Sequence, residues 1–172
     1  MFLDFLKGFF IKRKLNNRLI NVKYTSSSKR VTTIGIIIDE DHLRKRTDLI
    51  KEIVNHGIEE RSIRCLVFIN KVKKESNPTG LNLSWKQIDW KGQIIDQEII
   101  AFQQKPFDVL INYYTASKAP LLLLTHNSQS LFKVGFDSID KRLNHLIIKT
   151  DPYDHKIFTG ELFKYLKILN KI

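Results

Sequence analysis

Cysteine, glycine, proline and long apolar runs are all scarce in this chain of 172 residues. The single cysteine, Cys65, excludes an intramolecular disulfide framework and favours a reducing compartment. With only seven glycines and four prolines, the chain is neither collagen-like nor of low complexity. Its hydrophobic fraction of 42% is far too high for a disordered chain. The length suits one domain that buries a proper core.

The common motifs for cofactors, metals and nucleophiles are also missing. The turn after the first predicted strand, Ile38-Asp39-Glu40-Asp41-His42, is acidic and lacks the glycines of a dinucleotide-binding loop. There is no P-loop, no G-x-S-x-G elbow, no H-E-x-x-H and no CxxC pair. The histidines show no metal-ligand spacing; they are His42, His56, His126, His145 and His155. We therefore expect neither a cofactor nor a metal ion.

Positive charge is concentrated at the N-terminus. The chain has a formal net charge of +11, and residues 1–30 hold eight lysines and arginines against the single acid Asp4, a net charge of +7. The other 142 residues carry only +4, an ordinary value for a soluble domain. We expect a basic N-terminal arm over 1–30 and one domain over 31–172, joined by the polar segment 25–30.

The first nineteen residues predict a helix that is both aromatic and basic. Phenylalanines and leucines recur at helical spacing in two rows that do not share one face, so either the apolar stripe winds around the helix or the helix breaks near Gly8. The apolar stretch precedes its basic run and lacks a cleavage site, unlike a signal peptide, and it is too short to span a bilayer. The residues expected to contact an anionic surface are Lys7, Lys12, Arg13, Lys14 and Arg18.

Three interpretations of this helix stay open. In the first, its Phe-rich face packs on the domain and its basic face is exposed. In the second, it lies in a membrane interface, with aromatics at the acyl boundary and lysines at anionic headgroups. In the third, it is a basic arm on nucleic acid, including ribosomal RNA, where lysines neutralise phosphates.

The remainder of the chain alternates buried strands with helices. Runs of β-branched and apolar residues without polar alternation are typical of strands buried on both faces. The expected strands are 31–38, 64–69, 84–90 (near a sheet edge), 107–114, 132–136 and 144–150, and the expected helices are 41–56, 96–104, 117–125 and 154–170. This order predicts an α/β fold: an open, largely parallel sheet of five to six strands with helices on both faces, Rossmann-like or flavodoxin-like. The segment 70–83 is expected to be an exposed basic loop.

In such a sheet, ligands bind beyond the carboxyl ends of the strands. Asp39 follows the first strand, Lys118 follows the 107–114 strand, and Asp151 follows the last one. The two carboxylates could act as acid and base, or hold a hard cation, while Lys118 counters an anionic group. Equally, the aspartates could cap a helix and form a turn, with Lys118 solvated.

Two further polar segments are weaker candidates. His126 follows the leucine-rich helix, where it is a possible general base or, more commonly, closes the helix C-terminus. The segment from Trp85 to Lys91 interleaves aromatics and lysines, as single-stranded nucleic acid would require. On a strand, however, Trp85 and Trp90 would face opposite sides, so one core and one surface tryptophan is the simpler prediction.

The whole chain resembles an uncharacterised domain-of-unknown-function family of small proteins from flavobacteria and related Bacteroidota. The similar segments are Phe9 to Leu15, Ile34 to Asp39, Ser84 to Gly92, Phe107 to Tyr114 and Phe132 to Phe136. None of these is a catalytic motif, so the resemblance carries over no functional residue. It implies a bacterial, non-secreted protein.

Two functional hypotheses follow. The first is a non-enzymatic α/β binding or adaptor module whose basic arm docks on an anionic surface, either membrane or RNA. It would be cytoplasmic and possibly peripheral to the inner membrane. The alternative is an enzyme that acts on a small anionic substrate at the strand ends, around Asp39, Lys118 and Asp151. Protein partners and oligomeric state are not predicted.

Overall fold

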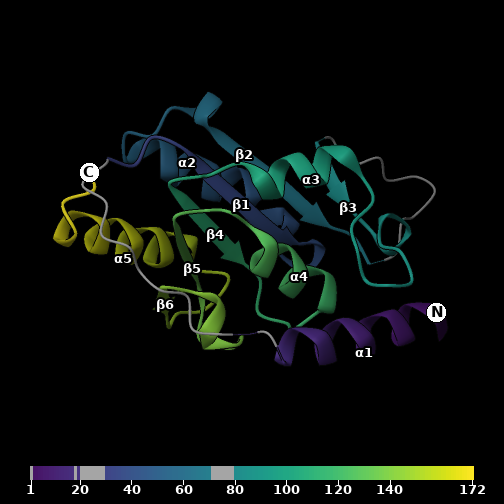
Figure 1. Ribbon diagram of the computed structural model, residues 1–172. Helices are drawn as coiled ribbons and strands as arrows, with labels where there is room; N and C mark the ends of the chain where they lie inside the picture. Colours follow the sequence, from purple (N-terminus) through teal and green to yellow (C-terminus); the bar gives the residue numbers. More distant parts are fainter. Residues whose placement is uncertain (1, 18, 20–29, 71–79) are drawn as a thin grey trace.

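The computed structural model describes residues 2–17, 19, 30–70 and 80–172 (Figure 1). Within these residues, six parallel strands form one open sheet, and five α-helices pack around it. The strands are β1 (Ile34–Asp39), β2 (Ile63–Phe68), β3 (Leu81–Leu83), β4 (Val109–Tyr113), β5 (Phe132–Phe136) and β6 (Leu146–Ile148). The α-helices are α1 (Phe2–Asn16), α2 (Arg46–Asn55), α3 (Gln97–Gln104), α4 (Ala119–Asn127) and α5 (His155–Ile168). The predicted α/β class and the predicted N-terminal helix are confirmed.

The order across the sheet is β3-β2-β1-β4-β5-β6. β1 and β4 are central, and every residue of both strands is buried. The chain builds outward from β1 to β3 on one side, then crosses back and builds from β4 to β6 on the other. The direction of winding therefore reverses between β1 and β4, and open α/β sheets commonly bind ligands at the carboxyl ends of the two strands where this happens.

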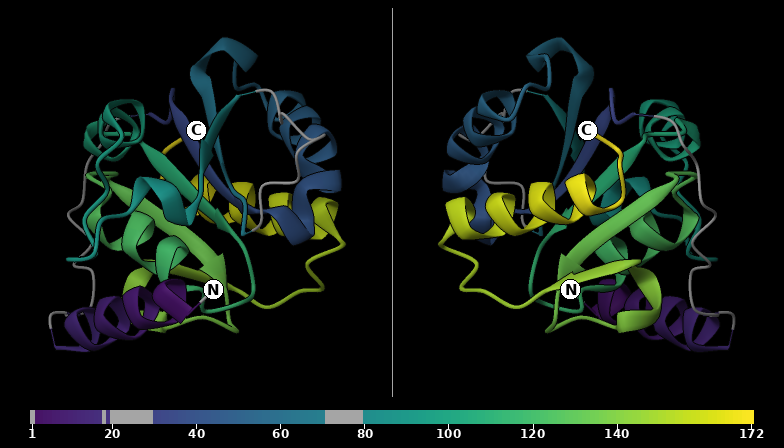
Figure 2. Two further views of the ribbon diagram at one scale, coloured as in Figure 1. Left: turned by 90° about the vertical axis from the view of Figure 1, so that its right-hand side faces the viewer. Right: turned by 90° about the vertical axis from the view of Figure 1, so that its left-hand side faces the viewer.

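The helices cover both faces of the sheet (Figure 2). On one face, α2 and α5 bury Leu49 and Phe158 in a core cluster that includes Ile36 and Ile38. On the other face, α1, α3 and α4 form a second cluster that includes Ile37. Alternate β1 side chains enter opposite clusters, as the pleat of a strand requires. This explains why the strand sequence is continuously apolar.

Local sequence signals account for several element ends. The side chain of Asp96 accepts hydrogen bonds at the start of α3, and that of Asp154 does the same for α5. Gly57 follows α2 with a φ of 93°, the left-handed conformation that ends many helices. The predicted helix over 41–56 begins as a 3-10 helix over Glu40–Lys45 before α2 starts.

Two local predictions are wrong. Residues 84–90 do not form the edge strand; β3 does, inside the segment predicted to be a loop, of which 71–79 lie outside the described residues. Ser84 and Gln87 form a capping box that starts a 3-10 helix over Trp85–Gln87 and ends the strand. Trp90 is exposed as predicted, whereas Trp85 is only half-buried against the second core cluster and is not a core residue. The helix predicted over 117–125 begins two residues later, at Ala119, because Lys118 occupies the N-cap position with an extended backbone.

Candidate functional site

The carboxyl ends of β1 and β4 form the first candidate site. Asp39 is the last residue of β1, and Lys118 immediately precedes α4. The Lys118 Nζ lies 2.8 Å from the Asp39 carboxylate and 2.7 Å from Asp41 Oδ2. The structure therefore brings together two of the residues that the sequence placed at the strand ends.

This ion pair is largely shielded from solvent on its Asp39 side. The side chain of Asp39 is 1% exposed and that of Lys118 is 26% exposed, whereas Asp41 is largely solvated. Burial alone would lower the pKa of Lys118, but hydrogen bonds and charge from Asp39 and Asp41 outweigh it and raise that pKa. Lys118 is thus held as an ammonium ion and is already neutralised by protein carboxylates.

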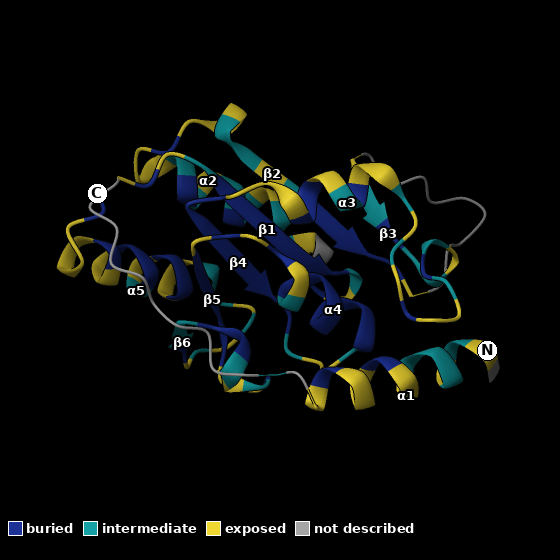
Figure 3. Ribbon diagram, in the orientation of Figure 1, coloured by how far each residue is buried: buried dark blue, intermediate teal, exposed yellow. Residues whose placement is uncertain are grey.

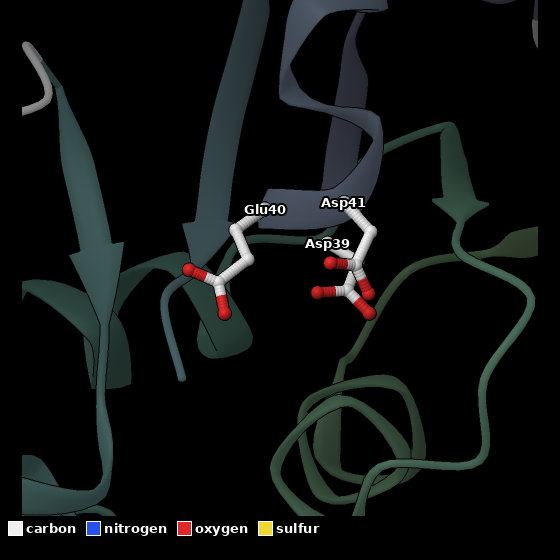
Figure 4. Close-up of side chains that lie close together, drawn as sticks. All are labelled: Asp39, Glu40 and Asp41. Atoms are coloured by element: carbon white, nitrogen blue, oxygen red, sulfur yellow. The ribbon is translucent and has the colours of Figure 1, made fainter. Parts of the chain in front are cut away.

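Three consecutive acids, Asp39, Glu40 and Asp41, stand where β1 ends and the 3-10 helix begins (Figure 4). Oxygens of Asp39, Glu40 and Asp41 lie within 4.8 Å of one another. The carboxylates of Asp39 and Asp41 lie side by side, while Glu40 points away from them and accepts a hydrogen bond from the Asn70 backbone at 2.8 Å. The Lys118 ammonium group occupies the position that a metal ion between the two aspartates would need. With one cation for three acids, the cluster is unfavourable for an anionic substrate.

His42, next to this cluster, was not selected from the sequence. Its Nε2 lies 3.3 Å from Thr115 Oγ1, and its ring packs edge-on against Tyr113 and Tyr153. Burial lowers the pKa of His42, and the nearby charges of Asp39 and Asp41 oppose that shift. The residue is buried, and its Nδ1 has no hydrogen-bond partner among the described residues. Only its position after the acidic turn could have singled it out.

Asp151 and His126 do not join the ion pair. Asp151 is exposed, and its Oδ1 accepts a hydrogen bond from the Tyr153 backbone at 2.8 Å, as expected for a turn residue. Within the described part of the chain, the acids paired with Lys118 are Asp39 and Asp41. His126 lies in the last turn of α4, at the opposite end of that helix from Lys118. The predicted convergence of Asp39, Lys118 and Asp151 is therefore limited to the first two.

The second candidate site is α1, which packs against α4 (Figure 1). Ile11 and Leu15 are buried in the second core cluster. Gly8 allows close approach, since a Cβ there would lie 3.3 Å from the Trp85 ring. Lys7 Nζ donates hydrogen bonds to the backbone oxygens of Ile88 at 2.6 Å and Trp85 at 3.3 Å. Lys7 thus anchors the helix to the domain instead of facing solvent.

The opposite side of α1 is exposed (Figure 3). Four large apolar side chains are between 53% and 71% exposed: Leu3, Phe5, Phe9 and Phe10. The next turn exposes three cations, Lys12, Arg13 and Lys14. The expectation that the Phe-rich face packs on the domain is therefore wrong, because the Gly8, Ile11 and Leu15 row packs there instead. Arg18 lies outside the described residues.

A crevice of about 490 Å³ runs between α1 and the carboxyl edge of the sheet. Phe5 and Phe9 line one wall, and Phe68, Trp85 and Lys118 line the other. The Trp85 indole is oriented by a 3.0 Å hydrogen bond from its Nε1 to a side-chain oxygen at the end of β2, that of Asn70. The crevice is mainly apolar and connects the outer face of α1 with the ion pair.

Comparison with known proteins identifies a family but no function. No helix among the described residues is long and apolar enough to cross a membrane. No curated protein and no solved structure matches the chain significantly. One family model matches residues 7–169, from within α1 to just beyond the end of α5. The chain therefore belongs to DUF6913, a family of unknown function.

Proposed function

We propose that this protein is a non-enzymatic α/β module that attaches to an anionic membrane surface through the outer face of α1. The observation that carries the proposal is the exposure of Leu3, Phe5, Phe9 and Phe10 on a helix that the domain holds in place. Large exposed apolar groups that cluster on one element are typical of an interaction surface. The cations of the following turn supply the charge that anionic lipids attract.

The polarity of α1 changes along its length. Its first ten residues present aromatic and aliphatic groups, and its last turns present Lys12, Arg13 and Lys14. A helix of this kind fits an interface when its apolar end enters the acyl boundary and its basic end stays among the headgroups. Each basic residue near such a surface contributes about 1 kcal/mol.

This layout favours lipid over RNA. An RNA-binding helix needs cations spread along the phosphate backbone, whereas Lys7 is used internally. Aromatic rings can stack on bases, but Leu3, which is 70% exposed, cannot. Burial in an acyl boundary satisfies all four exposed apolar side chains.

Catalysis at the strand ends has less support. The position of the Asp39–Lys118 pair at the reversal of the sheet favours a ligand site there. However, Lys118 is paired with two carboxylates and offers no free charge to an anionic substrate. We therefore keep the enzyme hypothesis as the second candidate.

Vesicle co-sedimentation tests the membrane proposal. The full chain should bind vesicles that contain anionic phosphatidylglycerol and should bind purely zwitterionic vesicles much more weakly. Lys12→Gln with Arg13→Gln should lower the partition coefficient about thirtyfold, from two charges at about 1 kcal/mol each. Phe5→Ser with Phe10→Ser should lower it at least as much.

The exposed face of α5 provides matched controls. Lys156→Gln with Lys167→Gln removes two exposed charges, and Ile157→Ser with Ile168→Ser removes two exposed apolar groups. Neither pair should change vesicle binding. Equal losses from α1 and α5 variants would contradict docking through α1. If the protein binds a single-stranded RNA tightly but does not bind vesicles, the membrane proposal is wrong and RNA is the partner of α1.

A further inference from the structure

A second cavity lies behind α1, away from the Asp39–Lys118 pair. It has a volume of about 340 Å³ and is enclosed by α1, the turn at 92–94, α3 and α4. This volume is at the lower end of the range for small-molecule sites. His126, which the strand-end site does not use, lines this cavity.

One residue of the cavity wall carries a buried donor without a partner among the described residues. Gln103 of α3 lines it and is only 7% exposed. Its Nε2 has no hydrogen-bond partner among the residues that the structure describes. A buried amide donor left unpaired destabilises the folded protein, because it has lost its hydrogen bonds to water without gaining others. A ligand that brings an oxygen acceptor to this amide would remove that destabilisation.

The remaining walls define the chemistry of the ligand. Lys14 of α1 contributes a cation, and no carboxylate is among the lining residues. Ile11, Leu15 and Leu123 supply apolar surface. The cavity therefore combines a cation, an unpaired amide donor and an apolar wall.

We propose that this cavity binds a small organic carboxylate with a short apolar body. The carboxylate would accept a hydrogen bond from Gln103 and face Lys14, while the apolar body would pack on Ile11 and Leu15. Hydrogen bonds to a charged acceptor are stronger than neutral ones, which favours the carboxylate over an alcohol. The site shares Lys14 with the proposed membrane surface, but its ligand and its Gln103 donor play no part in that proposal.

Binding should also tighten the attachment of α1. Ile11 and Leu15 come from α1, whereas Gln103 and Leu123 belong to the domain. A ligand that contacts both sides binds the docked helix and not a detached one. By linkage, its presence favours the docked state. Hydrogen exchange of the α1 amides should therefore slow when the ligand is added.

Calorimetry of the full chain with hexanoate, 1-hexanol and hexylamine tests the proposal. Hexanoate should bind at least tenfold tighter than the alcohol or the amine. Gln103→Leu, which keeps the volume but removes the donor, should abolish that preference without loss of stability. Lys14→Gln should weaken hexanoate binding severalfold. Gln104→Leu, on the exposed side of the same helix, and Lys156→Gln, on the exposed face of α5, are the controls and should leave the affinity for all three probes unchanged.

Four results would overturn the proposal. These are no hexanoate binding at millimolar concentration, equal affinity for the three probes, a preference that survives Gln103→Leu, and amide NMR shifts that map to the crevice at Lys118. None of them bears on vesicle binding, so failure here is distinguishable from failure of the membrane proposal.

Discussion

Lys133 places a side-chain nitrogen between β5 and α4, and no carboxylate of the described residues forms an ion pair with it. The residue is 5% exposed, and its Nζ donates a 2.7 Å hydrogen bond to the backbone oxygen of Thr125. The salt bridges of the described residues do not include it. Burial lowers its pKa from 10.5 to about 8. The folded state therefore disfavours the charged form that the unfolded chain carries at neutral pH.

The sign and size of the effect follow from that difference. Between pH values of about 8 and 10.5, the unfolded chain binds more protons at Lys133 than the folded protein does. The free energy of unfolding contributed by this lysine therefore rises with pH across this window. Taking the two pKa values, the rise between pH 7 and pH 9.5 is about 2 kcal/mol.

Lys133→Met isolates this contribution, because other groups titrate in the same range. Cys65, whose pKa burial raises to about 11, acts in the opposite direction and is common to both proteins. Removing a buried charge that costs about 3 kcal/mol should outweigh a lost hydrogen bond of about 1 kcal/mol. We expect the variant to be more stable by about 1 to 2 kcal/mol at neutral pH, with this advantage disappearing as the pH rises.

Urea unfolding of both proteins at several pH values measures the difference directly. Lys167→Met, at an exposed position of α5, is the matched control and should give a difference that does not vary with pH. A wild type that is more stable than Lys133→Met at neutral pH, with a pH-independent difference, would refute the reasoning. It would mean that Lys133 finds as favourable an environment in the fold as in water.

Three further predictions concern other buried ionisable groups. Burial alone would raise the pKa of Asp108, but hydrogen bonds from the backbone and hydroxyl groups of two threonines before β1 lower it to about 2. Asp108→Asn should therefore cost about 1 to 2 kcal/mol in urea unfolding at neutral pH, and the cost should vanish as the pH falls from about 4 to about 2. Because burial raises the pKa of Cys65 to about 11 from 9.0, its alkylation in the native protein should be about a hundredfold slower than in urea, and equal rates would contradict this. Lys118→Met leaves Asp39 unpaired and should cost about 3 kcal/mol, whereas adding Asp39→Asn should recover most of the stability; a double variant as unstable as the single one would show that the pair is not the cause.

The sheet was predictable because its signals are local. Continuous β-branched runs such as Ile34 to Ile38 indicate strands buried on both faces, and helices between them require parallel pairing. The edge strand β3 was less predictable. Leu81–Leu83 is only three residues long, and its strand character depends on pairing with β2. A capping box at Ser84 then ends it, a signal that was present in the sequence but hidden by the aromatic residues around it.

Which face of α1 packs could not be read from its sequence, because apolar residues occur on every side of that helix. The choice depends on partners far along the chain. Lys7 finds free carbonyl oxygens in the 85–88 segment, and Gly8 allows the helix to approach Trp85. Both contacts exist only once the domain is folded. The Phe-rich side remains outside because the glycine side packs more closely.

The candidate-site residues also differ in whether the sequence or only the folded structure reveals them. Asp39 ends β1 and Lys118 follows β4, and these two central strands are parallel neighbours. The strand order alone therefore brings the two residues to the same edge of the sheet, where they form an ion pair. His126 could have been excluded on the same basis, since eight helical residues after Lys118 place it about 12 Å further along α4. Gln103 gave no signal, because a glutamine in a short amphipathic helix is ordinarily solvated. It becomes significant only where α1 closes over it, so the cavity is a consequence of how the N-terminal helix docks.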